Sequence, residues 1–245
     1  LQYAAPGAEF NVYPNGTYVG DSALGPFTYA PYNPISYKPG GFMTGAGHGN
    51  TFQDVHGNWW NTGTPWLGIV WNFERRLAMF PAGFDADGQM YANTRFGDFP
   101  HWMPTSRWTD SASLFTGWML LSYRKSVSAS SARDGFPASN VTDEDRQTFW
   151  LAGTNSSDEW LRIDLGGERE VRAVQVNFVD HESGLYAPDT IAGTRFRTPA
   201  SRDGRSWEPI ADLSRDTLDR ASPYIELARP TRARYLRYEH LQVAS

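Results

Sequence analysis

The clearest strand signal in this chain lies in the stretch Trp160-Leu161-Arg162-Ile163-Asp164-Leu165, where apolar and polar residues alternate. Alternation with a period of two is typical of a strand that buries one face. The same pattern recurs in residues 171–179 and 235–238. No convincing helix is indicated, because Pro223 interrupts the nearest candidate, residues 217–227. We therefore predict an all-β fold.

The composition agrees with this fold class and excludes several functions. Aromatic residues make up 15% of the chain, and 23 Gly with 16 Pro favour strands joined by tight turns. A net charge of -5 argues against nucleic acid or an anionic membrane as a partner. No apolar run reaches the roughly 18 residues that a membrane span needs. The lack of cysteine excludes disulfides, thiolate metal sites and a cysteine nucleophile.

Two regions that differ in composition and in residue patterning indicate two domains. Residues 1–108 are dense in Gly, Pro and Trp, and turn signals break their short β-like runs. Residues 126–245 carry more charge and alternate more cleanly. We place the boundary near Arg124, with residues 109–125 as a connector.

Residues 126–245 contain an ordered series of motifs: VSASS (127–131), PASNVTD (137–143), TFW (148–150), EWLRIDLG (159–166), SRDGRSW (201–207) and RYLR (234–237). The series resembles the discoidin, or factor five/eight type C, domains, which include the family 32 carbohydrate-binding modules. The resemblance implies a β-sandwich that binds a polysaccharide or oligosaccharide. Trp150 and Trp160 would fill its core between two sheets. The loop that contains His181, Tyr186 and Arg195 could bind sugar, although the sequence does not fix this.

The same resemblance implies a structural calcium ion held by hard oxygen ligands. Asp143 and Thr148 match the side-chain ligands of the family's calcium loop. The cluster at residues 143–145 fits a solvated acidic turn equally well. The late Glu that usually closes this site is expected to be missing, because Glu239 is poorly placed. No organic cofactor is expected.

The first half predicts four successive antiparallel strands, near residues 51–54, 59–64, 75–81 and 90–92. Such a series is typical of one propeller blade. Upstream of it, glycines flank His48 on both sides in GAGHGN (45–50). Glycine at these positions permits a close approach of the backbone. A structural histidine in a tight turn is the alternative to a functional one.

Four segments of the first half carry a second resemblance: YAAPGAEF (3–10), LGPF (24–27), GAGHGN (45–50), and RRLAMFP (75–81) with DADG (85–88). Together they resemble the family 43 glycoside hydrolases, which are five-bladed propellers acting on arabinose- and xylose-containing polysaccharides. The resemblance implies about the last two blades of such a propeller. It also implies an inverting mechanism with two carboxylates. Those carboxylates are expected upstream of Leu1, so the chain alone is expected to be inactive.

By this resemblance, one side of the propeller would hold the substrate-binding residues Glu9, Tyr13, His48, Trp66, Trp71 and Arg75. His48 would also lie beside a bound cation. A core position for each Trp, and a surface pair for Arg75 with Arg76, are the alternatives. The whole is interpreted as a segment of a secreted or cell-surface glycosidase. A carbohydrate-binding or adhesion protein without catalysis is the second interpretation.

Overall fold

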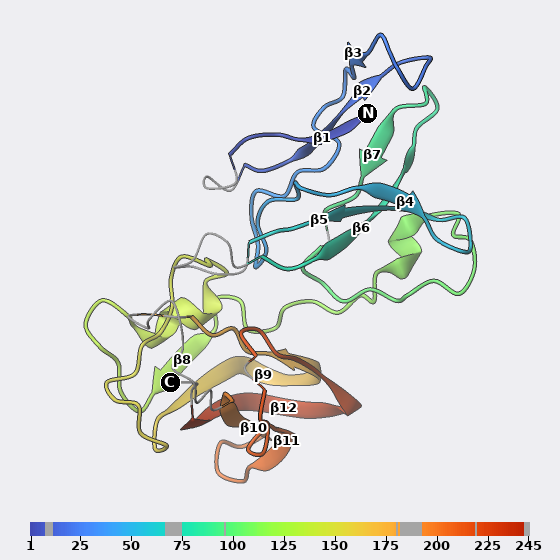
Figure 1. Ribbon diagram of the computed structural model, residues 1–245. Helices are drawn as coiled ribbons and strands as arrows, with labels where there is room; N and C mark the ends of the chain where they lie inside the picture. Colours follow the sequence, from blue (N-terminus) through green and yellow to red (C-terminus); the bar gives the residue numbers. More distant parts are fainter. Residues whose placement is uncertain are drawn as a thin grey trace. The chain divides into compact units, whose positions relative to one another are not determined.

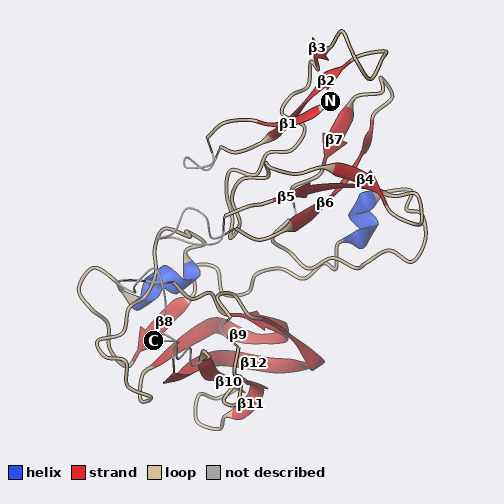
Figure 2. Cartoon of the chain, in the orientation of Figure 1, coloured by secondary structure: helices blue, strands red, loops and turns tan. Residues whose placement is uncertain are grey.

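A computed structural model of the chain describes residues 1–7, 12–66, 75–95, 97–179, 181, 193–218 and 220–242. The chain divides into two compact units, Leu1–Met119 and Leu120–Ser245. Strands are the main regular structure of both units, and the described helices are two short 3-10 helices, Ser111–Leu114 and Ala138–Thr142 (Figure 2). The prediction of an all-β fold is confirmed. None of the described helices has the length and apolarity to cross a membrane.

The first unit contains two antiparallel sheets (Figure 1). One has the order β1-β2-β3. The other follows the sequence as β4-β5-β6-β7, which confirms the predicted series of four strands. The bounds are β1 Gln2–Ala4, β2 Asn15–Val19, β3 Thr28–Tyr29, β4 Thr51–Gln53, β5 Trp59–Gly63, β6 Ala78–Phe84 and β7 Met90–Ala92.

The buried Asn15 of β2 hydrogen-bonds both the glycine-rich segment and Thr62 of β5. Asn15 is 0% exposed, and its Nδ2 donates to the carbonyl of Ala46 at 2.7 Å. Its Oδ1 accepts from the backbone N–H of Gly49 at 3.3 Å. A Cβ on Gly49 would lie 1.6 Å from the carbonyl oxygen of Thr62, so only glycine fits there. The close backbone approach expected around His48 is therefore confirmed.

The second unit is built on one five-stranded antiparallel sheet with the order β11-β10-β12-β9-β8. The bounds are β8 Ser126–Ala129, β9 Trp160–Gln175, β10 Arg195–Ser201, β11 Glu208–Asp212 and β12 Tyr224–Gln242. The two long strands β9 and β12 pair along most of their length, with register shifts between residues 226 and 231 and between 233 and 235. This arrangement fits a discoidin-like β-sandwich.

The core of the second unit lies on the Leu161 face of β9. Leu161 is 5% exposed and Leu165 is 0% exposed, and Ile163 packs on the same cluster. Trp160 alternates to the opposite face, where it is half-buried beneath the guanidinium of Arg237, with the Cζ atom 4.9 Å from its ring centroid. The core position predicted for Trp160 is therefore wrong, because the aliphatic residues of the strand take the buried face.

Candidate functional site

The second unit presents three rings in mutual contact, which we call the aromatic triangle: Phe136, Phe149 and His181. Ring centroids lie 4.8 Å apart for the two Phe residues, 5.0 Å for Phe136 with His181, and 5.1 Å for Phe149 with His181. All three residues are half-buried, so part of each ring faces solvent. Partly exposed rings of this kind stack against the C–H faces of sugars.

Backbone hydrogen bonds hold the loops that carry the triangle. The N–H of Leu151 donates to the carbonyl of Phe136 at 3.3 Å, and the N–H of Arg133 donates to the carbonyl of Leu151 at 2.8 Å. The side chain of Asn140 donates to the carbonyl of Phe149 at 3.0 Å. The backbones of Phe136 and Phe149 are thus held by hydrogen bonds between loops rather than by strand pairing.

Sequence reasoning named His181 as a sugar-binding candidate but missed its two partners. The available signal was that Phe136 and Phe149 both lie outside any alternating segment, where no sheet face buries them. Tyr186, the other aromatic candidate of that loop, lies outside the described residues. Arg195 begins β10, where its Nε donates to the carbonyl of Asp216 at 3.1 Å.

A buried layer of aromatic residues lies within the same unit. Phe196 is 0% exposed, and its ring centroid lies 5.7 Å from Phe178 and 5.6 Å from Tyr238. Tyr238 shares a hydrogen bond of 3.0 Å with Nδ1 of His240. Burial raises the pKa of Tyr238 and lowers that of His240, so both groups are neutral at physiological pH.

The predicted calcium ligands Asp143 and Thr148 do lie together. The hydroxyl of Thr148 donates to Oδ2 of Asp143 at 2.6 Å and lies 3.1 Å from the carbonyl oxygen of Asp145. These three oxygens suit a hard cation. Within the described part of the chain, no three His, Cys, Asp or Glu side chains converge on one metal position. The residues therefore fit only part of a calcium shell.

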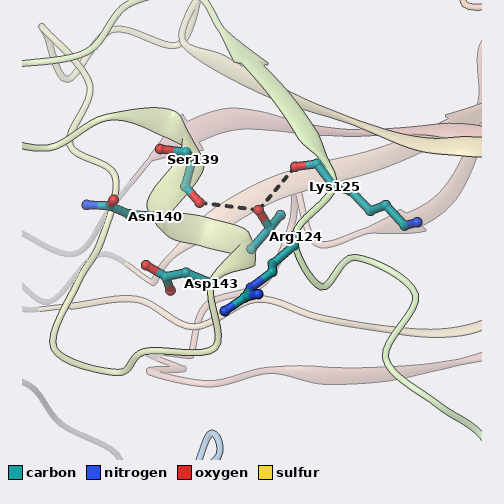
Figure 3. A pocket seen from close by; sticks show the side chains of 6 residues that line it. Arg124, Lys125, Ser139, Asn140 and Asp143 are labelled. Atoms are coloured by element: carbon teal, nitrogen blue, oxygen red, sulfur yellow. Dashed lines mark hydrogen bonds between the residues drawn. The ribbon is translucent and has the colours of Figure 1, made fainter.

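Asp143 also lines a cavity of about 290 Å³ (Figure 3). Arg124 and Lys125 line it as well, together with Ser139, Asn140 and Thr142. Figure 3 labels Arg124 and Asp143 among the side chains that line this cavity.

In the first unit, the structure brings together three of the predicted substrate-binding residues. The rings of Tyr13 and His48 meet edge to face, with centroids 6.4 Å apart. The Cζ atom of Arg75 lies 5.9 Å from the centroid of the Tyr13 ring. His48 has a φ of 57°, a left-handed conformation that non-glycine residues seldom adopt. Such strain is common at functional sites. The cation-binding role expected for His48 stays a prediction.

The other predicted residues of this site are placed differently. Trp66 is only 7% exposed and pairs through its backbone with Thr44 and Arg75, so its indole packs inside the unit. That placement agrees with the core alternative rather than with an exposed stacking face. Glu9 and Trp71 lie outside the described residues.

Two carboxylates of the first unit form hydrogen bonds and an ion pair that stabilise the fold. Asp54 accepts hydrogen bonds from the backbone N–H groups of His56 and Asn58 and from Nε1 of Trp60, which lower its pKa despite the opposing effect of desolvation. Asp98 lies 2.7 Å from Nζ of Lys38, and burial raises its pKa despite this partner. Neither group is placed as a free acid or base.

Comparison with known proteins supports a family assignment for the second unit. The family model described as F5/8 type C domain matches residues 126–245. No curated protein sequence matches the chain. A solved glycoside hydrolase aligns with 20% identity and a TM-score of 0.46, covering 99% of this chain and 54% of that one. The chain thus spans about half the length of that hydrolase.

Two solved carbohydrate-binding modules align over about half of the chain. Chitosan-binding module 1 of a chitosanase/glucanase from Paenibacillus sp. IK-5 has 22% identity and a TM-score of 0.41, covering 51% of this chain and 87% of that one. A family 32 module from Clostridium perfringens, in complex with GlcNAc-alpha-1,4-galactose, has 19% identity and a TM-score of 0.42, covering 53% and 83%. The family match, together with the five-stranded sheet, shows that residues 126–245 form an F5/8 type C domain.

Proposed function

We propose that the second unit binds carbohydrate at the aromatic triangle. The observation that carries this proposal is the mutual contact of Phe136, Phe149 and His181 in loops that backbone hydrogen bonds hold. The two phenyl rings supply apolar faces for the C–H surface of a sugar. His181 adds ring nitrogens that can hydrogen-bond hydroxyl groups. The family match over residues 126–245 supports the same conclusion.

The test measures binding of the whole chain to neutral saccharides by isothermal titration calorimetry. Galactose, chitotriose, xylo-oligosaccharides and arabino-oligosaccharides form the panel; chitotriose and galactose are bound in two other matched modules. Phe136→Ala should weaken binding about tenfold, because it removes the burial of a large apolar face. Tyr224→Ala is the matched control, since Tyr224 is 45% exposed and has no ring contact within the described residues.

Two outcomes would contradict carbohydrate binding at the triangle. One is a saccharide affinity for Phe136→Ala equal to that of the unaltered chain. The other is a glycan array that stays blank while a protein or lipid ligand binds, which would favour the adhesion alternative.

We further propose that the first unit belongs to a glycosidase-type propeller that acts on arabinose- or xylose-containing polysaccharides by inversion. The four-stranded antiparallel sheet β4–β7 and the convergence of Tyr13, His48 and Arg75 support this proposal. An arginine beside an aromatic ring is suited to hydrogen-bond sugar hydroxyls. The first unit would then supply the wall of a pocket, with the acid and base outside this chain.

This second proposal is tested by binding and by turnover. Arabino- or xylo-oligosaccharides should bind the chain, Arg75→Ala should weaken that binding, and the neighbouring Arg76→Ala should leave it unchanged. Aryl arabinofuranosides and xylosides should not be hydrolysed, because Asp54 and Asp98 are engaged in structure. Turnover by the chain alone would refute the placement of the catalytic groups, and equal effects of the two Arg variants would refute the pocket.

Finally, we propose a weak calcium site at Asp143, Thr148 and the carbonyl of Asp145. With a single side-chain carboxylate among these ligands, the dissociation constant should lie near the weak end of protein calcium sites, about millimolar. Calcium at ten times that concentration should then stabilise the second unit by about 1.4 kcal/mol. Asp143→Asn should abolish this gain. Equal thermal shifts for both proteins would exclude the site.

A further inference from the structure

A second cavity of the second unit lies on the face of the sheet opposite its aliphatic core. Its volume is about 400 Å³. We call it the Arg162 groove; it is lined by Ser126, Val127, Ser128, Arg162, Asp164, Asp203, Gly204, Arg205 and Tyr235. Ile163 and Leu236, the strand neighbours of Arg162 and Tyr235, pack on the core. The groove therefore uses the polar face of the strands.

Strand register and one turn build the groove. Ser128 pairs with Arg162, and Asp164 pairs with Tyr235, so β8, β9 and β12 bring these side chains together. The turn after β10 forms another wall. Gly204 there has a φ of 74°, and a Cβ on it would lie 3.3 Å from the Tyr235 ring.

The acidic groups of the groove are already satisfied. Asp164 forms two hydrogen bonds of 2.8 Å with the guanidinium of Arg234. One oxygen of Asp203 accepts from the backbone N–H groups of Arg205 and Ser206, both at 2.8 Å, and thereby shapes the turn. The charge of Arg162 adds to the hydrogen bonds from Arg234 in lowering the pKa of Asp164.

Two guanidinium groups of the groove make no direct hydrogen bond or ion pair with a carboxylate of the described residues. The Arg162 guanidinium lies 5.8 Å from the centroid of the Tyr235 ring and forms no hydrogen bond or ion pair with the described residues. The same holds for the exposed side chain of Arg205 within that part of the chain. Together with Arg234, whose Cζ atom lies 4.9 Å from the centroid of the Tyr235 ring, Arg162 and Arg205 place three positive charges against the two negative charges of Asp164 and Asp203, in a chain whose net charge is -5.

We propose that the Arg162 groove binds the carboxylate of an acidic saccharide, such as a uronic acid unit. A planar guanidinium can donate two parallel hydrogen bonds to a carboxylate. The hydroxyls of Ser126 and Ser128 are available for the hydroxyl groups of the sugar ring. The volume falls within the range of roughly 300–1,000 Å³ that is usual for small-molecule sites. This site is separate from the aromatic triangle and uses different residues.

The test compares trigalacturonic acid with its neutral methyl ester, using calorimetry on the whole chain. The acid should bind, its affinity should fall as salt rises, and the ester should bind at least tenfold more weakly. Arg162→Gln and Arg205→Gln should each weaken acid binding by about tenfold, since each removes a charge-assisted contact. Arg215→Gln is the matched control, because Arg215 is exposed and does not line the groove.

Several outcomes would overturn this assignment. Equal affinity for the acid and the ester would show that the carboxylate is not recognised. Binding of a sulfated saccharide, with no binding of trigalacturonic acid, would show the same. Unchanged binding by both Gln variants would place the ligand elsewhere. Arg205 lies in an exposed turn, so its variant tests the groove even if Arg162→Gln unfolds. Binding of neutral saccharides should be unchanged in both variants, which separates this result from the proposal for the aromatic triangle.

Discussion

Replacing Glu159 with Gln should destabilise the second unit strongly. Glu159 is only 6% exposed, yet its carboxylate accepts hydrogen bonds from the hydroxyls of Ser130, Ser131 and Thr154 and from the backbone N–H of Thr154. These contacts connect the end of β8 to the loop that precedes β9. Gln keeps the shape of the side chain but replaces one accepting oxygen with a donor.

The pKa of Glu159 gives the size of the effect. Hydrogen bonds from Ser130 and the other donors lower it from 4.5 to about 2, against the opposing effect of desolvation. Each unit corresponds to about 1.4 kcal/mol, so the ionised form stabilises the fold by about 3 kcal/mol relative to a neutral one. Because the folded-state pKa is depressed, this contribution is complete above about pH 4.5 and is lost as the pH falls through 2.

Scanning calorimetry of the whole chain measures the outcome. Glu159→Gln at pH 7 should lower the unfolding temperature of the second unit by about 10–15 °C. It should also flatten the fall in stability between pH 4.5 and 2. Asp158→Asn is the matched control, because its carboxylate makes no hydrogen bond to the described residues; its effect should stay within about 0.5 kcal/mol. A Glu159→Gln protein as stable as the control would refute the reasoning.

Two further predictions concern the first unit. Lys38→Met should leave Asp98, whose side chain is 9% exposed, as a buried charge without its partner, and should cost about 3 kcal/mol or more in unfolding free energy; an unchanged denaturation curve would contradict this. Gly49→Ala should place a methyl group against the carbonyl of Thr62. The protein should lose stability, and the nuclear magnetic resonance shifts of residues around His48 should change. Unperturbed shifts would show that the segment has room to move.

Strand patterns were predictable because alternation records which residues share a face. The alternating pattern predicted β9 and the end of β12. The turn signals predicted the strands of the sheet β4–β7 in the first unit. Alternation does not say which of two faces is buried, however. The family resemblance implies a core position for Trp160, but Leu161 and Leu165 occupy the core. A side chain with a ring can be covered by an arginine instead, as Arg237 covers Trp160.

The candidate sites were harder to predict, because they join residues that are distant in sequence. Glycines on both sides of His48 pointed to one member of the first-unit cluster, and the family resemblance supplied Tyr13 and Arg75. Nothing in the local sequence linked Phe136 to His181, since loops that meet in space carry no periodic pattern. The Arg162 groove depends on the register of three strands and on one turn, which the sequence does not specify.

The pairing of β8, β9 and β12 also has a mechanical consequence. The chain enters β8 at Ser126, beside Asp164. The pairing of β12 with β9 ends at Glu239, beside Trp160, at the other end of the same segment of β9. A pull on the two ends of this unit would therefore slide β8 and β12 along β9 in opposite directions. The hydrogen bonds of both ladders would then share the load and break together rather than one by one. Such a shear arrangement would let the domain stay folded, and so stay bound to an immobile ligand, while tension acts along the chain.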